Sequence, residues 1–195
     1  KTKELFSQDI QNILLVMPTG TGKTTVFSSL TKDWLSMGSR VLIAVHRIEL
    51  VDQIVERLAT FDIQAGVMAG DEPFYPELPV QVGMIQSLFK YSDWIPEYIV
   101  VDECHHSVAK TYLGLWERYP HTKILGVTAT PVRLDGKGFS DLYEAMLNLY
   151  PLDYFFEKGY LVRPIHYFCG ELPPSSLRDI SSGGDYSLSR QTRHL

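Results

Sequence analysis

The 195-residue chain is predicted to form an α/β domain: a mostly parallel sheet with helices on both faces. Short apolar runs alternate with stretches of helical periodicity, which is typical of parallel sheets. The first run, at 13–16, leads into a glycine-rich loop, and two later runs end in acidic or hydroxyl residues. Because parallel strands end at one edge of the sheet, we expect the loop and these polar residues to share one site.

Each element follows from the local pattern. Apolar runs bounded by polar residues predict strands, and the amphipathic stretches between them predict helices. The segment 71–79 holds three prolines and is predicted to be a loop. Strands are expected at 13–17, 41–45, 63–68, 80–84, 98–102 and 124–128, and helices at 22–36, 47–60, 86–91, 107–118 and 139–148.

A phosphate-binding loop is predicted at 17–24, where the sequence reads MPTGTGKT. Glycines let successive backbone N–H groups face phosphate oxygens, and the helix that follows adds its positive end. Lys23 would reach the β- and γ-phosphates, and the Thr24 hydroxyl would ligate Mg²⁺. Met17 stands where the strict pattern has glycine, and a turn that merely opens a helix is the weaker alternative. The expected ATP-binding residues are Thr19, Gly20, Thr21, Gly22, Lys23, Thr24 and Thr25.

A second part of the site is predicted where the apolar run 98–101 ends in Asp102 and Glu103. Asp102 would hold Mg²⁺ together with Thr24, mainly through the water shell that this ion keeps. Glu103 would act as the general base that orients and deprotonates the attacking water. An acidic pair after a strand is more often a solvated strand end, but the phosphate loop upstream favours the catalytic interpretation, with Glu103, Lys23 and Asp102 as the catalytic residues.

A third signal, LGVTATP at 125–131, makes a family resemblance specific. The order MPTGTGKTT, DECHH and TATP resembles motifs I, II and III of superfamily 2 helicases and translocases of the DExH subgroup, over residues from about 13 to 165. Segments 41–53 and 82–88 resemble nucleic-acid-contacting motifs of the same proteins. Segments 133–139 and 159–164 look most like a bacterial and phage branch that includes RadD-type helicases and restriction-enzyme motor subunits.

The resemblance implies a RecA-like P-loop NTPase domain and gives roles to further residues. Short hydroxyl side chains can donate to one partner and accept from another, which suits a relay between nucleotide and domain movement. For the two arginines, a solvated surface charge is the competing interpretation. The implied coupling residues are His105, Thr128 and Thr130, and the implied nucleic-acid contacts are His46, Arg47, Gln86, Ser87 and Arg133.

The same resemblance predicts an N-terminal RecA-like domain over residues 1–168, truncated on its N-terminal side, and a linker at 169–195 toward a second RecA-like domain absent from the chain. Such proteins read adenine with an upstream glutamine, and neither Gln8 nor Gln11 stands at the expected distance. Because the second domain supplies arginines that stabilise the transferred phosphoryl group, this chain alone is expected to hydrolyse ATP poorly.

Composition limits the possible partners. A net charge of −5 argues against binding polynucleotides through bulk electrostatics, so nucleic-acid contacts should be local. Cys104 and Cys169, with scattered histidines, suit neither a four-ligand zinc site nor a disulfide framework, which predicts a reducing, cytoplasmic setting. Apolar runs fall well short of the roughly 18 residues of a membrane helix, so no membrane partner is expected.

These features predict the motor domain of a DNA helicase or translocase that uses ATP and Mg²⁺. DNA is favoured over RNA by the branch resemblance alone. An RNA-directed DExH helicase is the alternative within the class, because short motifs do not reveal 2′-hydroxyl contacts. A P-loop switch that does not hydrolyse ATP, or a small-molecule kinase, is the alternative outside it. Glu103 disfavours the switch, and the motif order disfavours the kinase.

Overall fold

The structure, a computed structural model, divides into two units, Lys1–Leu161 and Val162–Leu195. We describe the first unit, and the expected linker at 169–195 lies outside the described part of the chain. The described residues are 1–70, 72–91, 93–106, 110–130, 138–148 and 150–163.

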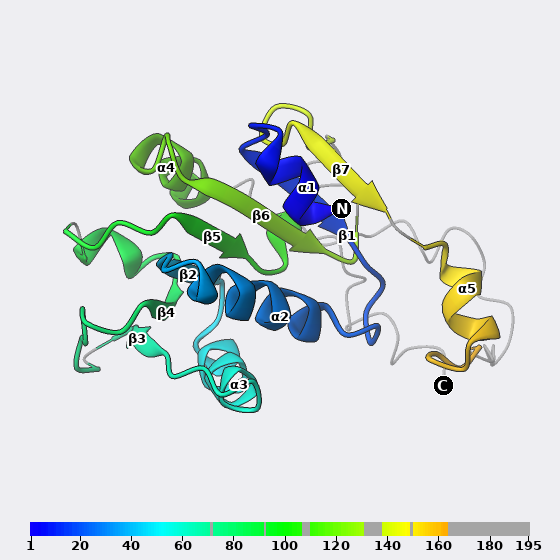
Figure 1. The fold of residues 1–195 in the computed structure, drawn as a ribbon, viewed down its shortest axis with the longest axis horizontal. Helices are drawn as coiled ribbons and strands as arrows, with labels where there is room; N and C mark the ends of the chain where they lie inside the picture. The colour runs from blue at the N-terminus through cyan, green and yellow to red at the C-terminus, as the bar shows by residue number, and fades with distance from the viewer. Residues whose placement is uncertain (71, 92, 107–109, 131–137, 149, 164–195) are drawn as a thin grey trace, which may run out of the picture. The chain divides into compact units, whose positions relative to one another are not determined.

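A seven-stranded sheet forms the centre of the first unit, in the order β3-β4-β2-β5-β6-β1-β7 (Figure 1). Every pairing is parallel, which confirms the predicted fold class. All six predicted strands are present, and the seventh, β7, was not predicted. The strands are β1 (Asn12–Val16), β2 (Val41–Val45), β3 (Gly66–Met68), β4 (Val80–Met84), β5 (Tyr98–Val101), β6 (Lys123–Thr128) and β7 (Ala145–Asn148).

The inner strands are apolar on both sides because each face of the sheet carries its own core. Ile13 and Leu15 of β1 join the core under α1 (Thr2–Ser7), α2 (Lys23–Ser36) and α3 (Ile48–Ala59). Leu14 and Val16 join the opposite core, which includes Leu115 of α4 (Lys110–Arg118). The prediction of helices on both faces is therefore confirmed.

The two helices that border the phosphate loop form for clear local reasons. In α2 the buried residues Phe27, Leu30 and Trp34 recur at helical spacing, and in α3 Val51, Ile54 and Leu58 do the same. Trp34 stacks on the ring of Tyr98 with centroids 4.3 Å apart, which fixes the far end of α2 on β5. The observed bounds lie within one residue of the predicted helices at 22–36 and 47–60.

The predicted helix at 139–148 is wrong. Phe139 and Tyr143 have the spacing of a helix face, but only one turn forms, with the Tyr143 N–H donating to the Phe139 carbonyl. The chain then pairs with the open edge of β1 as β7. The segment forms a strand because the N–H and C=O groups along one side of β1 would otherwise be unpaired.

Two other predicted elements are shorter than expected. The helix predicted at 86–91 is a single 3₁₀ turn, Leu88–Lys90, closed by hydrogen bonds between residues three apart. The strand predicted at 63–68 begins only at Gly66, because the N–H of Ile63 still bonds to the last turn of α3 at Leu58. The loop prediction for 71–79 is confirmed for residues 72–79.

Two short helices were not predicted: α1 and α5 (Leu152–Glu157). Helix α5 ends in a Schellman turn, in which Gly159 takes a φ of 71°. The N–H of Tyr160 donates to the carbonyl of Phe155 at 2.9 Å, and the N–H of Gly159 donates to that of Phe156 at 3.1 Å. This turn reverses the chain after the helix.

Gly126→Ala should destabilise the domain by about 1–3 kcal/mol through overpacking. A Cβ at this position would overlap the ring and hydroxyl of Tyr143. That ring cannot move aside easily, because it is buried between Trp116 at 5.6 Å and Phe139 at 5.8 Å. Urea unfolding measures the loss. Gly138→Ala is the matched control, since nothing lies within 4 Å of its added Cβ, and equal stability of the two variants would contradict the packing shown here.

Candidate nucleotide-hydrolysis site

The phosphate loop joins β1 to α2 and adopts a backbone that requires its glycines. Gly20 and Gly22 have φ angles of 80° and 88°, a region that other residues rarely enter. Gly22 caps α2, so Lys23 and Thr24 lie in its first turn. At Met17, where the strict pattern has glycine, the N–H donates to the Thr128 carbonyl at 2.9 Å. The β1–β6 ladder thus continues to Met17, and a side chain is tolerated in that extended backbone.

A cleft of 530 Å³ opens over the loop and is lined by most of the residues predicted to bind and hydrolyse ATP. Thr21 is the exception among the expected ATP-binding residues, since its hydroxyl donates to the Pro18 carbonyl at 2.6 Å and it lines a neighbouring cavity. The loop and the acidic pair, 78 positions apart in sequence for Thr24 and Asp102, meet here as expected. The cleft is lined by Thr19, Gly20, Gly22, Lys23, Thr24, Thr25, Leu50, Gln53, Ile54, Arg57, Asp102 and Glu103.

Asp102 follows β5 directly and is buried, with 8% of its surface exposed. The pKa of its carboxyl is raised to about 6, mainly by burial and next by the negative charge of Glu103, although the hydrogen bond from the Glu103 N–H and the Lys23 ammonium act to lower it. A desolvated carboxylate gains most from a nearby cation. Asp102 and the Thr24 hydroxyl supply the oxygen donors that Mg²⁺ prefers, so the residues present fit a magnesium nucleotide.

Glu103 lies at the centre of the polar contacts. Its φ of 47° is unusual for a residue with a side chain and costs on the order of 1–2 kcal/mol. The conformation is held by its N–H, which donates to the Asp102 carboxylate at 3.0 Å. One carboxylate oxygen of Glu103 lies 3.2 Å from the Lys23 ammonium, and the other lies 3.3 Å from His105 Nδ1.

His105 connects this acid to the end of β6. Its Nδ1 lies 3.1 Å from the hydroxyl of Thr128, which is fully buried. The same hydroxyl donates to the carbonyl of Thr130 at 3.1 Å and accepts from its N–H at 3.0 Å. Thr130 therefore takes part through its backbone, and the three expected coupling residues are brought together.

The expected nucleic-acid residues are less uniform. Arg47 and Gln86 are exposed after β2 and β4, whereas Ser87 is buried and precedes the 3₁₀ turn. His46 lies close to the acidic cluster, and its pKa is lowered. Burial is the main cause, followed by the charge of Arg47; Glu103 acts to raise this pKa and His105 to lower it. Arg133 lies outside the described residues. The structure thus places His46 beside the hydrolytic groups.

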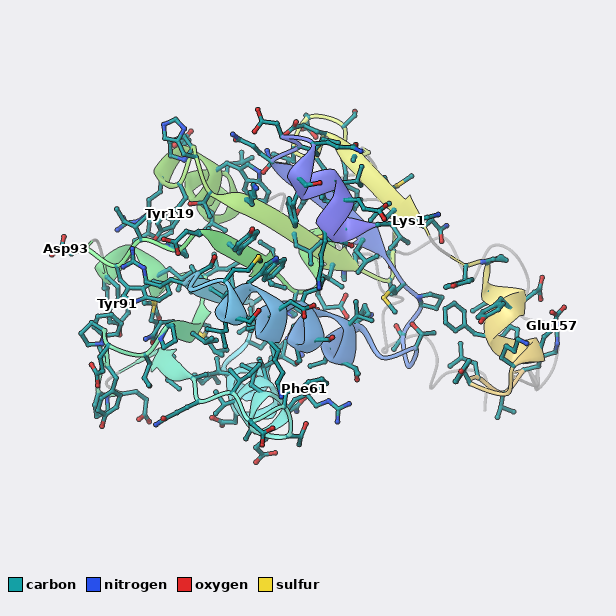
Figure 2. All side chains as sticks on the ribbon, in the orientation of Figure 1. Lys1, Phe61, Tyr91, Asp93, Tyr119 and Glu157 are labelled. Atoms are coloured by element: carbon teal, nitrogen blue, oxygen red, sulfur yellow. The ribbon has the colours of Figure 1, made fainter. Side chains whose placement is uncertain are left out.

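The clearest omission from the sequence prediction is Arg57 of α3. Its guanidinium donates to the Thr25 hydroxyl at 2.6 Å and lies 5.5 Å above the ring of Phe61, which is labelled in Figure 2. Leu50, Gln53 and Ile54 reach the cleft beside it. Positions 50, 53, 54 and 57 have the spacing of one helix face, which was the available signal.

The described residues offer neither a metal cluster made of side chains alone nor a membrane-spanning helix. No group of three or more histidine, cysteine or acidic side chains there could hold a metal ion by itself. Cys104 is fully buried, and burial raises the pKa of its thiol to about 12, so it is not a reactive thiolate. None of the helices in this part of the chain has the length and hydrophobicity to cross a bilayer.

The fold and the geometry of the site together define a RecA-like P-loop domain. A family described as "Type III restriction enzyme, res subunit" matches residues 1–133. The chain belongs to this family, and it is a RecA-like domain similar to those of restriction-enzyme subunits and superfamily 2 helicases.

Individual relatives agree with this placement. A 51.5 kDa protein of Lactococcus phage (isolate 7-9) is 32% identical over 89% of this chain and 36% of its own length. The DNA 3'-5' translocase XPB2 of Sulfurisphaera tokodaii is 30% identical over 64% of this chain and 28% of that protein. The UvsW helicase of bacteriophage T4 shares the fold, with a TM-score of 0.61 at 18% identity over 70% of this chain and 54% of its own. The chain thus spans only part of each.

Asp102→Asn should stabilise the metal-free protein above pH 6 by up to about 3 kcal/mol, since a shift of one pKa unit corresponds to about 1.4 kcal/mol. The folded-state pKa of about 6 lies above the ordinary value of 3.8 for an aspartate, so folding disfavours the ionised carboxyl. The gain is full above pH 6 and fades as the pH falls from 6 toward 4. Urea unfolding with EDTA at pH 8 and pH 5 measures it.

The exposed Asp52→Asn is the control for this pH dependence, with an expected change within about 0.5 kcal/mol at either pH. A loss of stability in Asp102→Asn at pH 8 would show that the carboxylate is better paired than its surroundings indicate.

Proposed function

We propose that this domain binds MgATP and is the catalytic half of a motor that hydrolyses ATP while moving along, or unwinding, DNA. The observation that carries the proposal is the continuous set of contacts from Lys23 through Glu103 and His105 to Thr128. Glu103, the group that would activate water, contacts Lys23 of the phosphate loop. Through His105 it is also connected to Thr128, the last residue of β6.

In this proposal each residue has a defined task. Lys23 and the loop N–H groups bind the β- and γ-phosphates, and Thr24 and Asp102 hold Mg²⁺, which when bound neutralises phosphate charge. Glu103 accepts the proton of the attacking water. Bound phosphate competes with the Glu103 carboxylate for the Lys23 ammonium. His105, Thr128 and Thr130 transmit the change at Glu103 to the segment after β6.

The nucleic acid and the missing half of the site are also part of the proposal. Local contacts to one nucleic-acid strand would come from the five predicted residues, His46, Arg47, Gln86, Ser87 and Arg133. A second RecA-like domain of the same polypeptide would close the site with arginines, a contribution of about 10³–10⁵ in rate. The relative named as a DNA translocase supports DNA, and a cytoplasmic location accords with such a substrate.

ATP turnover by the complete polypeptide should rise with single-stranded, duplex or forked DNA and rise less with RNA. The reason is that nucleic acid and the second domain complete the proposed active site. Lys23→Ala serves as the blank for contaminating ATPase activity. Stimulation by RNA alone would move the protein to the RNA-directed class, and turnover that no nucleic acid changes would favour the nucleotide switch.

Glu103→Gln in the same polypeptide should retain ATP binding and lose turnover by about 10²–10⁴, because the amide keeps the size of the side chain but cannot accept the proton. Binding is measured by calorimetry and turnover by phosphate release. The exposed Glu117→Gln of α4 is the control and should behave as wild type. Undiminished turnover in Glu103→Gln would remove this residue from its role.

A further inference from the structure

A second cavity, of 280 Å³, borders the phosphate loop beside the hydrolytic cleft. Residues 19, 20 and 22 of the loop line the cleft, whereas Met17 and Thr21 line this second cavity. The loop is therefore the wall that the two spaces share. Its other walls are Val16 and Val26 from the ends of β1 and α2, and the aromatic segment 150–160.

Half of the residues that line this cavity are aromatic. Tyr150, Tyr154, Phe155 and Tyr160 all face it, and Tyr150 stacks on Tyr154 with ring centroids 4.3 Å apart. Phe155 is buried, but Tyr150 and Tyr160 are 49% and 67% exposed. Exposed rings around an apolar cavity beside a functional loop are typical of a ligand subsite.

The aromatic segment is fixed against the loop. The Schellman turn after α5, whose last residue Glu157 is labelled in Figure 2, directs the chain back on itself. Leu161, the first residue after this turn, lies close to Gly20: a Cβ added at Gly20 would be 3.1 Å from the Cδ2 atom of Leu161. The cavity and the phosphate loop thus belong to one packed region.

We propose that this cavity holds the aromatic base of the nucleotide whose phosphates the loop binds, with Tyr150 and Tyr154 as stacking partners. The inference rests on the proposed function, because it takes a nucleoside triphosphate as the ligand. A flat base fits an apolar, ring-lined cavity of this size, and stacking on aromatic side chains stabilises any base through its π-face.

The test compares two ligands, MgATP and magnesium tripolyphosphate, on the complete polypeptide by calorimetry. Tyr150→Ala should raise the Kd for ATP about tenfold and leave that for tripolyphosphate unchanged, because only ATP carries a base. Tyr150→Phe keeps the ring and should bind ATP as wild type does. Tyr75→Ala, at a loop position with the same 49% exposure, is the matched control and should change neither Kd.

The outcomes separate this inference from the proposed function. If Lys23→Ala abolishes ATP binding but Tyr150→Ala binds ATP normally, the base lies elsewhere or another segment fills the cavity, and the inference fails alone. An equal loss of affinity for both ligands in Tyr150→Ala would also overturn it, since the ring would then act on the loop. If the wild type binds neither ligand, or Lys23→Ala binds both normally, the proposed function fails as well.

Discussion

The parallel pairing of three neighbouring strands, β5, β6 and β1, is the constraint on which the site depends. Val16 pairs with Thr128, and Val101 pairs with Gly126, so the three strands end at nearly the same level. Their next residues are therefore the phosphate loop, the acidic pair and the threonine segment. If β6 were antiparallel, Thr128 would lie at the opposite edge of the sheet. The strand direction, and not any single contact, therefore brings the polar groups together.

Two residues of the site lower the stability of the folded domain. Asp102 is ionised only at the cost of desolvation, and Glu103 holds a left-handed backbone. Both costs come from one turn, in which the Asp102 carboxylate accepts the Glu103 N–H and so directs the next side chain toward Lys23. The surrounding sheet supplies the compensation, since the strand residues before this turn, Val100 and Val101, are fully buried.

Sequence reasoning succeeded where burial on both faces forces a continuous apolar run. That condition located β2 and β4 to the residue. Motif order predicted that Lys23, Asp102 and Glu103 share one site, and the fold brings them into one cleft. Sequence reasoning failed for β7, because Phe139 and Tyr143 have helical spacing and only the open edge of β1 favours a strand. Arg57 was missed for a similar reason: its role depends on α2 and α3 lying side by side, and a local pattern does not encode that neighbour.

The hydrogen bonds available to His105 suit the coupling role proposed for it. Nδ1 carries at most one proton, yet it faces two partners, the Glu103 carboxylate at 3.3 Å and the Thr128 hydroxyl at 3.1 Å. A carboxylate only accepts, so a proton on Nδ1 is drawn to Glu103 while that group is charged. When Glu103 takes up a proton or turns toward another cation, Nδ1 can interact fully with Thr128, whose hydroxyl also holds both backbone groups of Thr130. In the proposed mechanism, the charge state of Glu103 would thereby change the hydrogen bonding of Thr130.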